Sequence, residues 1–95
     1  VDGSAQKVIN LQEQIAQDHL SPEERRKFDY FLLEAVRLKE KGEMDAAFDM
    51  YNHCLDIDPG SAVTQYELGK LYMYLGQADK GEKLLLAAMK AAPDN

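Results

Sequence analysis

The sequence predicts an all-α protein whose helices pair into hairpins, and three observations support this prediction. Apolar residues recur at spacings of three and four along most of the chain, as one face of an α-helix requires. Each of the three prolines, at positions 22, 59 and 93, falls where a helix is expected to begin or end. The stop signal DIDPGS at residues 56–61 has a counterpart at residues 90–95, where the chain reads KAAPDN. No stretch alternates convincingly with a period of two, so strands are not needed.

The first hairpin is expected to begin with a long helix over residues 22–41. Ser21 is a suitable N-cap, Pro22 suits the first helical position, and Glu24 can complete a capping box with the serine. Gly42 is expected to end this helix. One apolar stripe runs along it, made of Phe28, Phe31, Ala35 and Leu38.

The second helix is expected to begin at Met44 or Asp45 and to end at Ile57. Pro59 cannot continue a helix and disfavours helical geometry at the residue before it. The packing side of this helix consists of Ala47, Met50, Tyr51, Cys54 and Leu55.

The second hairpin is expected to repeat this arrangement. Ser61 caps a third helix over residues 62–74, and a fourth helix follows over residues 78–91. The short turns at Gly42 and Gly76 predict that the two helices of each hairpin are antiparallel neighbours.

The segment before the first hairpin, residues 1–20, is expected to be a tail with a short helix. Val8, Leu11 and Ile15 stand at helical spacing among glutamines between residues 5 and 18. A helix this short is marginal in water, so we expect it to need packing, for example against the first hairpin. Residues 1–4, VDGS, are interpreted as a processing junction or a cloning remnant and are left out of the fold.

Residues 28–61 and 62–95 form an internal repeat of two units of equal length. Few positions are identical, but the packing positions agree in character. The matched pairs include Gly42 with Gly76, Pro59 with Pro93, Ala35 with Gly69, Ala47 with Gly81, and Tyr51 with Leu85. Small residues therefore recur where two helices approach closely, and large residues recur where a gap must be filled.

This pattern resembles the tetratricopeptide repeat, a 34-residue helix–turn–helix unit. The second unit carries the pattern most clearly, at Tyr66, Leu68, Gly69, Tyr72, Leu75, Gly76, Ala88 and Pro93. The resemblance implies an α-solenoid with right-handed superhelical stacking, in which residues 21–61 and 62–95 are the two hairpins. It also implies a non-enzymatic protein–protein interaction module, a scaffold or adaptor. Gly81 replaces the alanine usual in the family, at an expected cost of about 1 kcal/mol in helix propensity.

No catalytic site, metal site or cofactor is expected from the sequence. His19 and His53 lack a partner at ligand spacing, and Cys54 occupies a small-residue position between helices, so its thiol is expected to be buried and unreactive. Motifs of phosphate loops, zinc proteases and serine hydrolases are absent from the sequence. The net charge of −6 argues against nucleic acid as a partner. No apolar run approaches the roughly 20 residues that a membrane span requires.

A protein or peptide partner is expected to bind in the concave groove lined by the first helix of each hairpin. If the apolar stripe of the first helix faces its hairpin partner, the residues about a quarter turn round line this groove. The expected groove residues are Asp29, Leu32, Val36, Lys39, Tyr66, Lys70, Met73 and Tyr74. They suit a peptide or helix with hydrophobic anchors, and the two lysines suit an acidic group. The alternative is that Leu32, Val36 and Tyr66 are covered by the N-terminal helix or a neighbouring unit.

The last helix is expected to leave one apolar side uncovered, because repeat arrays usually finish with a polar capping helix and none is expected after it. Fewer than three repeats are also marginal for stability. The expected self-association face consists of Leu84, Leu85, Ala88 and Met89. The chain is then part of a longer array, or the N-terminal helix folds back as a cap, or two chains pair as a homodimer. The alternative to a binding module is accordingly a structural spacer or oligomerisation segment of a larger protein. The compartment stays open between a bacterial cytoplasm and export.

Overall fold

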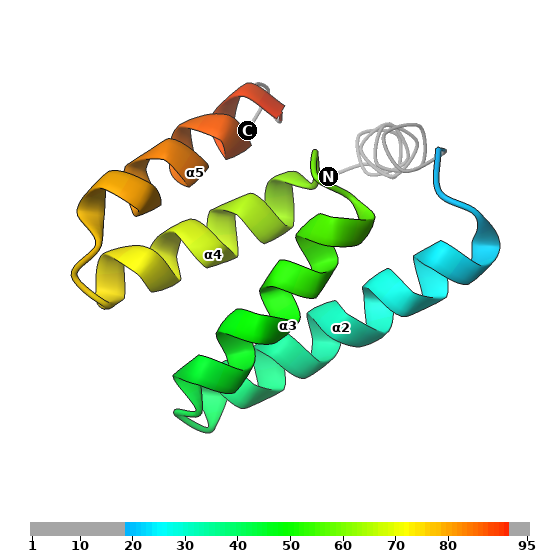
Figure 1. Ribbon diagram of the computed structural model, residues 1–95, viewed down its shortest axis with the longest axis horizontal. Coiled ribbons are helices and arrows are strands. Elements are labelled where there is room, and N and C mark those ends of the chain that lie inside the picture. Colours follow the sequence, from blue (N-terminus) through cyan, green and yellow to red (C-terminus); the bar gives the residue numbers. More distant parts are fainter. Residues whose placement is uncertain (1–18, 92–95) are drawn as a thin grey trace, which may run out of the picture.

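The computed structural model describes residues 19–91, which form four α-helices arranged as two antiparallel hairpins (Figure 1). The helices are α2 (Pro22–Glu40), α3 (Met44–Ile57), α4 (Ala62–Tyr74) and α5 (Ala78–Ala91). No strand occurs within residues 19–91. The all-α prediction is confirmed, and each helix begins and ends within one residue of its expected bounds. The helix expected at residues 5–18 lies outside the described residues.

Serine side chains cap both first helices. At α2 the backbone N–H of Ser21 donates to Glu24 Oε1 at 2.9 Å, and the Glu24 N–H donates to Ser21 Oγ at 3.0 Å. This is the expected capping box, and the hydrogen bond from the Ser21 backbone N–H is the main reason why the pKa of Glu24 is lowered. At α4 the Thr64 N–H donates to Ser61 Oγ at 3.3 Å.

The two interhelical turns have the same hydrogen-bond pattern. Gly42 and Gly76 have φ values of 84° and 82°, in the left-handed region where a side chain is strained. In the first turn Gly42 N–H donates to Lys39 O at 2.9 Å and Glu43 N–H donates to Leu38 O at 2.9 Å. The second turn repeats both bonds at the equivalent residues, at 3.1 and 2.9 Å. Each turn is therefore a Schellman motif closed by glycine, which reverses the chain in the same way.

The segment between the hairpins, residues 58–61, is termed here the α3–α4 joint. Asp58 and Ser61 are buried, and Ser61 N–H donates to Asp58 O at 3.1 Å. Gln65 Nε2 reaches back from α4 and donates to Pro59 O at 2.9 Å. His19, just before α2, lies at the same place, with its Nε2 3.2 Å from Asp58 Oδ1. Backbone and side chains on both sides thus fix the angle between the hairpins.

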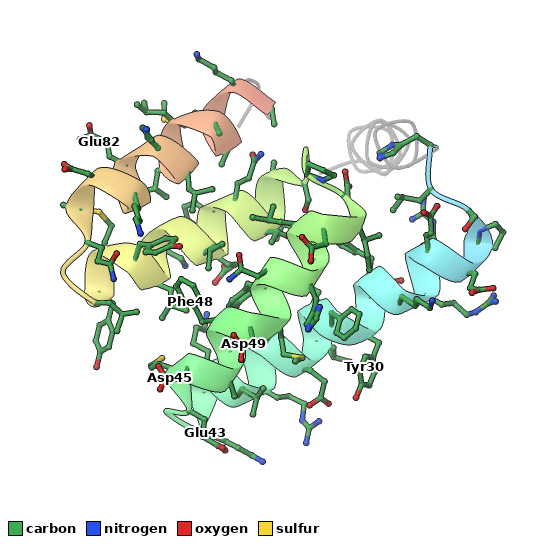
Figure 2. The ribbon with its side chains drawn as sticks, in the orientation of Figure 1. Tyr30, Glu43, Asp45, Phe48, Asp49 and Glu82 are labelled. Carbon is green, nitrogen blue, oxygen red and sulfur yellow. The ribbon has the colours of Figure 1, made fainter. Side chains whose placement is uncertain are left out.

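The hydrophobic core lies around α3, which contacts both α2 and α4, whereas α5 contacts α4 (Figure 1). Figure 2 shows Phe48 reaching from α3 toward α4, where its ring meets Tyr72 edge-on at 4.8 Å between centroids. The central cluster of buried residues consists of Ala35, Ala47, Tyr51, Leu68 and Leu71. The core therefore spans the first hairpin and its interface with α4.

The second hairpin is closed by glycines. A Cβ added to Gly69 would lie 3.1 Å from Gly81 O, and one added to Gly81 would lie 2.8 Å from Gly69 O. Both distances are shorter than ordinary van der Waals contact, so the two backbones touch. Gly81 lowers the helix propensity of α5, but α4 and α5 lie too close together at this position to accommodate the alanine usual in the family.

The predicted packing side of the first hairpin is confirmed in part. Phe28 and Ala35 are fully buried, but Phe31 is half-buried because its ring lies on the surface and stacks on His53 at 4.7 Å. Cys54 is buried as expected, and burial raises the pKa of its thiol to about 11. A thiol that stays protonated and enclosed is unreactive at neutral pH.

Candidate partner-binding surface

The first helices of the two hairpins, α2 and α4, are tied together by a charged contact. Lys39, in the last turn of α2, donates from Nζ to Glu67 Oε1 of α4 at 2.9 Å. Leu32 and Val36 precede Lys39 at helical spacing and share its side of α2. The α2–α4 surface is defined here by six residues, Leu32, Val36, Lys39, Tyr66, Glu67 and Lys70.

The α4 side of this surface combines a ring, a carboxylate and a second lysine. Lys70 Nζ lies 3.4 Å from Glu67 Oε2 and 4.4 Å from the centroid of the Tyr66 ring. Glu67 therefore contacts two lysines, and the three charged groups together carry one net positive charge. The arrangement offers a cation and an aromatic face side by side.

The lowered pKa of Glu67 reflects its contacts with the two lysines. Burial alone raises the pKa of Glu67, but the hydrogen bond from Lys39 and the charges of Lys39 and Lys70 together bring it below its ordinary value. The hydrogen bond to Glu67 raises the pKa of Lys39. Both groups are accordingly charged at neutral pH.

Tyr51 of α3 lies beneath the ion pair. Its ring is fully buried, and its hydroxyl has no hydrogen-bond partner within residues 19–91. Burial raises the pKa of Tyr51, while the charge of Lys39 lowers it and the charge of Glu67 raises it further. The hydroxyl is therefore a buried polar group next to the α2–α4 surface, where an unmade hydrogen bond is costly.

The structure brings some of the eight expected groove residues together. Lys39, Tyr66 and Lys70 are joined through Glu67, and Tyr66 is 48% exposed. Leu32 is half-buried and packs against the central cluster. The remaining four members differ in setting: Val36 is half-buried, whereas Asp29, Met73 and Tyr74 are exposed.

Met73 leans toward its hairpin partner. A Cβ on Gly81 of α5 would lie 2.7 Å from Met73 Sδ, so the methionine occupies the space that the glycine leaves free.

Glu67 was not among the residues expected from the sequence. Its spacing of three from Lys70 was a visible signal for a helical ion pair, but the contact with Lys39 depends on how α4 crosses α2.

The expected self-association face on α5 is placed partly inside the second hairpin. Leu84 packs against the central cluster, Leu85 faces Gly69, and Ala88 is buried. Met89 is 66% exposed and Leu86, which was not among the expected residues, is 51% exposed. The apolar area that α5 offers to solvent is therefore centred on Leu86 and Met89.

The surface at the two interhelical turns and along the start of α3 is polar and shallow. Figure 2 shows the exposed acids Glu43, just before α3, and Asp45 and Asp49 on its first half, consistent with a solvated helix face. Two open depressions of about 430 and 440 Å³ lie at the turns lined by residues 76–80 and 42–46. Neither is lined by a residue of the α2–α4 surface.

No group of three His, Cys, Asp or Glu side chains within residues 19–91 is placed to hold a metal ion. None of the four described helices combines the length and apolar character needed to cross a membrane.

Two helical hairpins that repeat in sequence and stack through α3 define a helical-repeat protein. A family model of the tetratricopeptide repeat matches residues 38–95, more than half of the chain. The chain therefore belongs to the tetratricopeptide repeat family, as the sequence pattern indicated. Members of this family typically act as non-catalytic scaffolds in protein interactions. No curated protein matches the chain in a sequence search.

Proposed function

We propose that this chain is a protein-interaction module that binds a peptide or helix on the α2–α4 surface. The observation that carries the proposal is the half-exposed Tyr66 ring with Lys70 over it, linked through Glu67 to Lys39 of the neighbouring helix. An aromatic face beside a cation, supported by half-buried Leu32, suits a partner with an apolar anchor and an acidic group.

The two lysines have different roles in this proposal. Lys39 makes the shorter contact with Glu67, 2.9 Å against 3.4 Å for Lys70, and the side chain of Lys70 is the more exposed of the two. Lys39 therefore holds α2 and α4 together, while Lys70 is free to turn toward an incoming carboxylate. An exposed charge pair adds little affinity, so the apolar anchor on Tyr66 supplies most of the binding energy.

Selection from a displayed library of short random peptides tests the proposal. Peptides enriched on the wild-type chain are synthesised and titrated against Tyr66→Ala/Lys70→Ala. We expect the double variant to bind at least about tenfold more weakly, because the ring and the cation act together. Helical circular dichroism should be unchanged, since both side chains are about half exposed and neither belongs to the buried core.

Lys83→Ala is the matched control, because Lys83 is an exposed lysine on α5, away from the α2–α4 surface. It should bind the same peptides as wild type. Equal binding by Tyr66→Ala/Lys70→Ala and wild type would remove the α2–α4 surface as the binding site.

A second candidate function is self-association through α5, as part of a structural or oligomerisation segment. The exposed Leu86 and Met89 favour it, because two large apolar side chains three residues apart form a helical stripe. In light scattering at rising concentration, wild type should exceed the mass of one chain and Leu86→Glu should stay monomeric. A wild-type chain that is monomeric at high concentration would contradict this candidate.

A further inference from the structure

One face of α2 is open to solvent in the described part of the chain, although the matching face of α4 is covered. Tyr30 and Leu33 are 61% and 66% exposed, and Figure 2 shows Tyr30 projecting away from α4 and α5. Their counterparts in the second unit are Thr64, which is fully buried, and Glu67, which is half-buried. The surface around Tyr30 and Leu33 is named here the outer α2 face.

The matching face of α4 is covered by α3. Thr64 lies beside Cys54 of α3, and Leu71 shares the central cluster with Tyr51. The repeat places Tyr30 at the position of Thr64, so the outer α2 face stands where a helix packs in the second unit. Two large apolar side chains three residues apart supply the area that such a helix would bury.

We propose that residues 5–18 of this chain form a helix that docks on the outer α2 face, as α3 docks on α4. The segment carries Val8, Leu11 and Ile15 on one side of a helix, and its other positions are mostly polar or small. Burial of that side against Tyr30 and Leu33 gives a helix of this length the packing that it needs in water.

The length of the segment and the place where the chain reaches α2 both fit this docking. His19 lies beside Asp58 of the α3–α4 joint, so the chain arrives at the end of α2 where α3 finishes. Only residues 19–21 separate the segment from Pro22, and so short a connection makes neighbouring helices antiparallel. The segment spans about 21 Å as a helix and Leu33 stands about 17 Å from the start of α2, so the reach is sufficient.

Antiparallel packing also gives an approximate register. Counting back from the connection, Ile15 comes opposite the first turn of α2 and Leu11 opposite the turn before Tyr30. Val8 then comes between Tyr30 and Leu33. Val8 and Leu11 thus come near Tyr30 and Leu33, whereas Ile15 comes opposite the charged first turn of α2. This docking leaves the α2–α4 surface free for a partner.

The proposed docking also accounts for the additional residues at the N-terminal end of α2. Phe28 is the counterpart of Ala62, where α4 begins, yet α2 begins at Pro22, well before Phe28. These additional residues of α2 give Ile15 and Leu11 a helix to pack against.

Disulfide trapping in the full 95-residue chain tests the docking. We expect Val8→Cys/Leu33→Cys to form an internal disulfide under mild oxidation in most molecules. The native Cys54 does not compete, because it is fully buried and its thiol pKa is about 11. The control pair Val8→Cys/Lys83→Cys puts the second thiol on an exposed part of α5 and should remain reduced.

Three outcomes would overturn the proposal: equal trapping of both pairs, no trapping of the first pair, or disulfides between chains. Equal trapping indicates an undocked segment, and disulfides between chains place a second copy on this face.

Hydrogen exchange provides a test without engineered thiols. Leu33→Glu should lower the protection of amides 8–15 at least about tenfold, because it puts a charge into the contact, while Lys83→Glu should leave them unchanged. Leu33 is largely exposed in the described part of the chain, so α2 and α3 should keep their own protection. Unchanged protection of amides 8–15 in Leu33→Glu would refute the docking.

Discussion

The first hairpin closes on alanines at positions 35 and 47, and the second closes on glycines at positions 69 and 81. Tyr51 fills the first seam and is fully buried, whereas its counterpart Leu85 is only half-buried. The two hairpins thus share the same turns and the same period, but their helices pack against each other in different ways. One fills the gap with a large side chain, and the other removes the gap by bringing the backbones into contact.

The difference shows where the stability of the molecule lies. The central cluster is shared by α2, α3 and α4, while the fully enclosed positions of α5 are Gly81 and Ala88, which carry little apolar area. α5 is therefore expected to open before the other described helices, because few large side chains anchor it. Substitutions at matched positions of the two hairpins can break or sharpen this comparison.

The largest effect is expected for Tyr51→Ala, with Leu85→Ala as its counterpart. Tyr51→Ala empties a fully buried site next to α4 and should cost about 3–5 kcal/mol of unfolding free energy, against about 2 kcal/mol for the half-buried leucine. Urea denaturation followed by circular dichroism measures both. Tyr51→Phe is the control and should not destabilise, because it removes only the hydroxyl that lacks a partner. Equal losses for the two alanine variants would show that the seams are equivalent.

A smaller effect is expected from exchanging the small residues. Gly81→Ala should destabilise by about 1–2 kcal/mol, although alanine favours helices, because its Cβ would press on the Gly69 carbonyl. Ala47→Gly should also destabilise, by about 1 kcal/mol or more, because it removes a buried methyl group and loosens the helix. Thermal unfolding compares them. A stabilised Gly81→Ala would mean that α4 and α5 can move apart at no cost.

The smallest effect is expected at the contact between the hairpins. Glu67→Gln should lose about 0.5–1 kcal/mol at neutral pH. Because the pKa of Glu67 is lowered, its contribution is present above pH 4.5 and is lost as the pH falls through the lowered value. Because the pKa of Lys39 is raised, its contribution to the free energy of unfolding is fully present below pH 10.5. This contribution is lost as the pH rises through the raised value.

Unfolding free energies of wild type and Glu67→Gln across the acid range measure this contribution. The two curves should converge in acid, where Glu67 is protonated. Glu23→Gln is the control, since the Glu23–Lys27 contact is 3.6 Å long and exposed, and its effect should be close to zero. Curves that stay parallel down to strong acid would show that Glu67 acts through packing and not through charge.

The helices could be predicted from the sequence because their signals are local. Ser21 with Glu24 starts α2, Gly42 and Gly76 close the turns, and Pro59 ends α3, and each acts on its immediate neighbours. Helical period alone also placed Leu32, Val36 and Lys39 on one side of α2. These local signals do not determine the angle and contacts with which one helix packs on another.

The parts that could not be predicted depend on that docking. Lys39 and Glu67 are 28 residues apart, and their contact depends on the angle set by the central cluster. Met73 has the spacing of a groove residue, but Gly81 gives it room against α5. Leu85 was expected both at a packing position, as the counterpart of Tyr51, and in the self-association face, and Gly69 lets it pack inside the hairpin. In each case a distant small residue or charge decides where the side chain goes.

The α3–α4 joint has a consequence for the thermodynamics of recognition. Its backbone bond between Ser61 and Asp58, and the bond from Gln65 to Pro59, hold the two hairpins at one angle before any partner arrives. A partner that bridges α2 and α4 then loses its own freedom but does not have to order the receptor. Binding of this kind keeps more of its contact energy as affinity, so a loosened joint would weaken a ligand that never touches it.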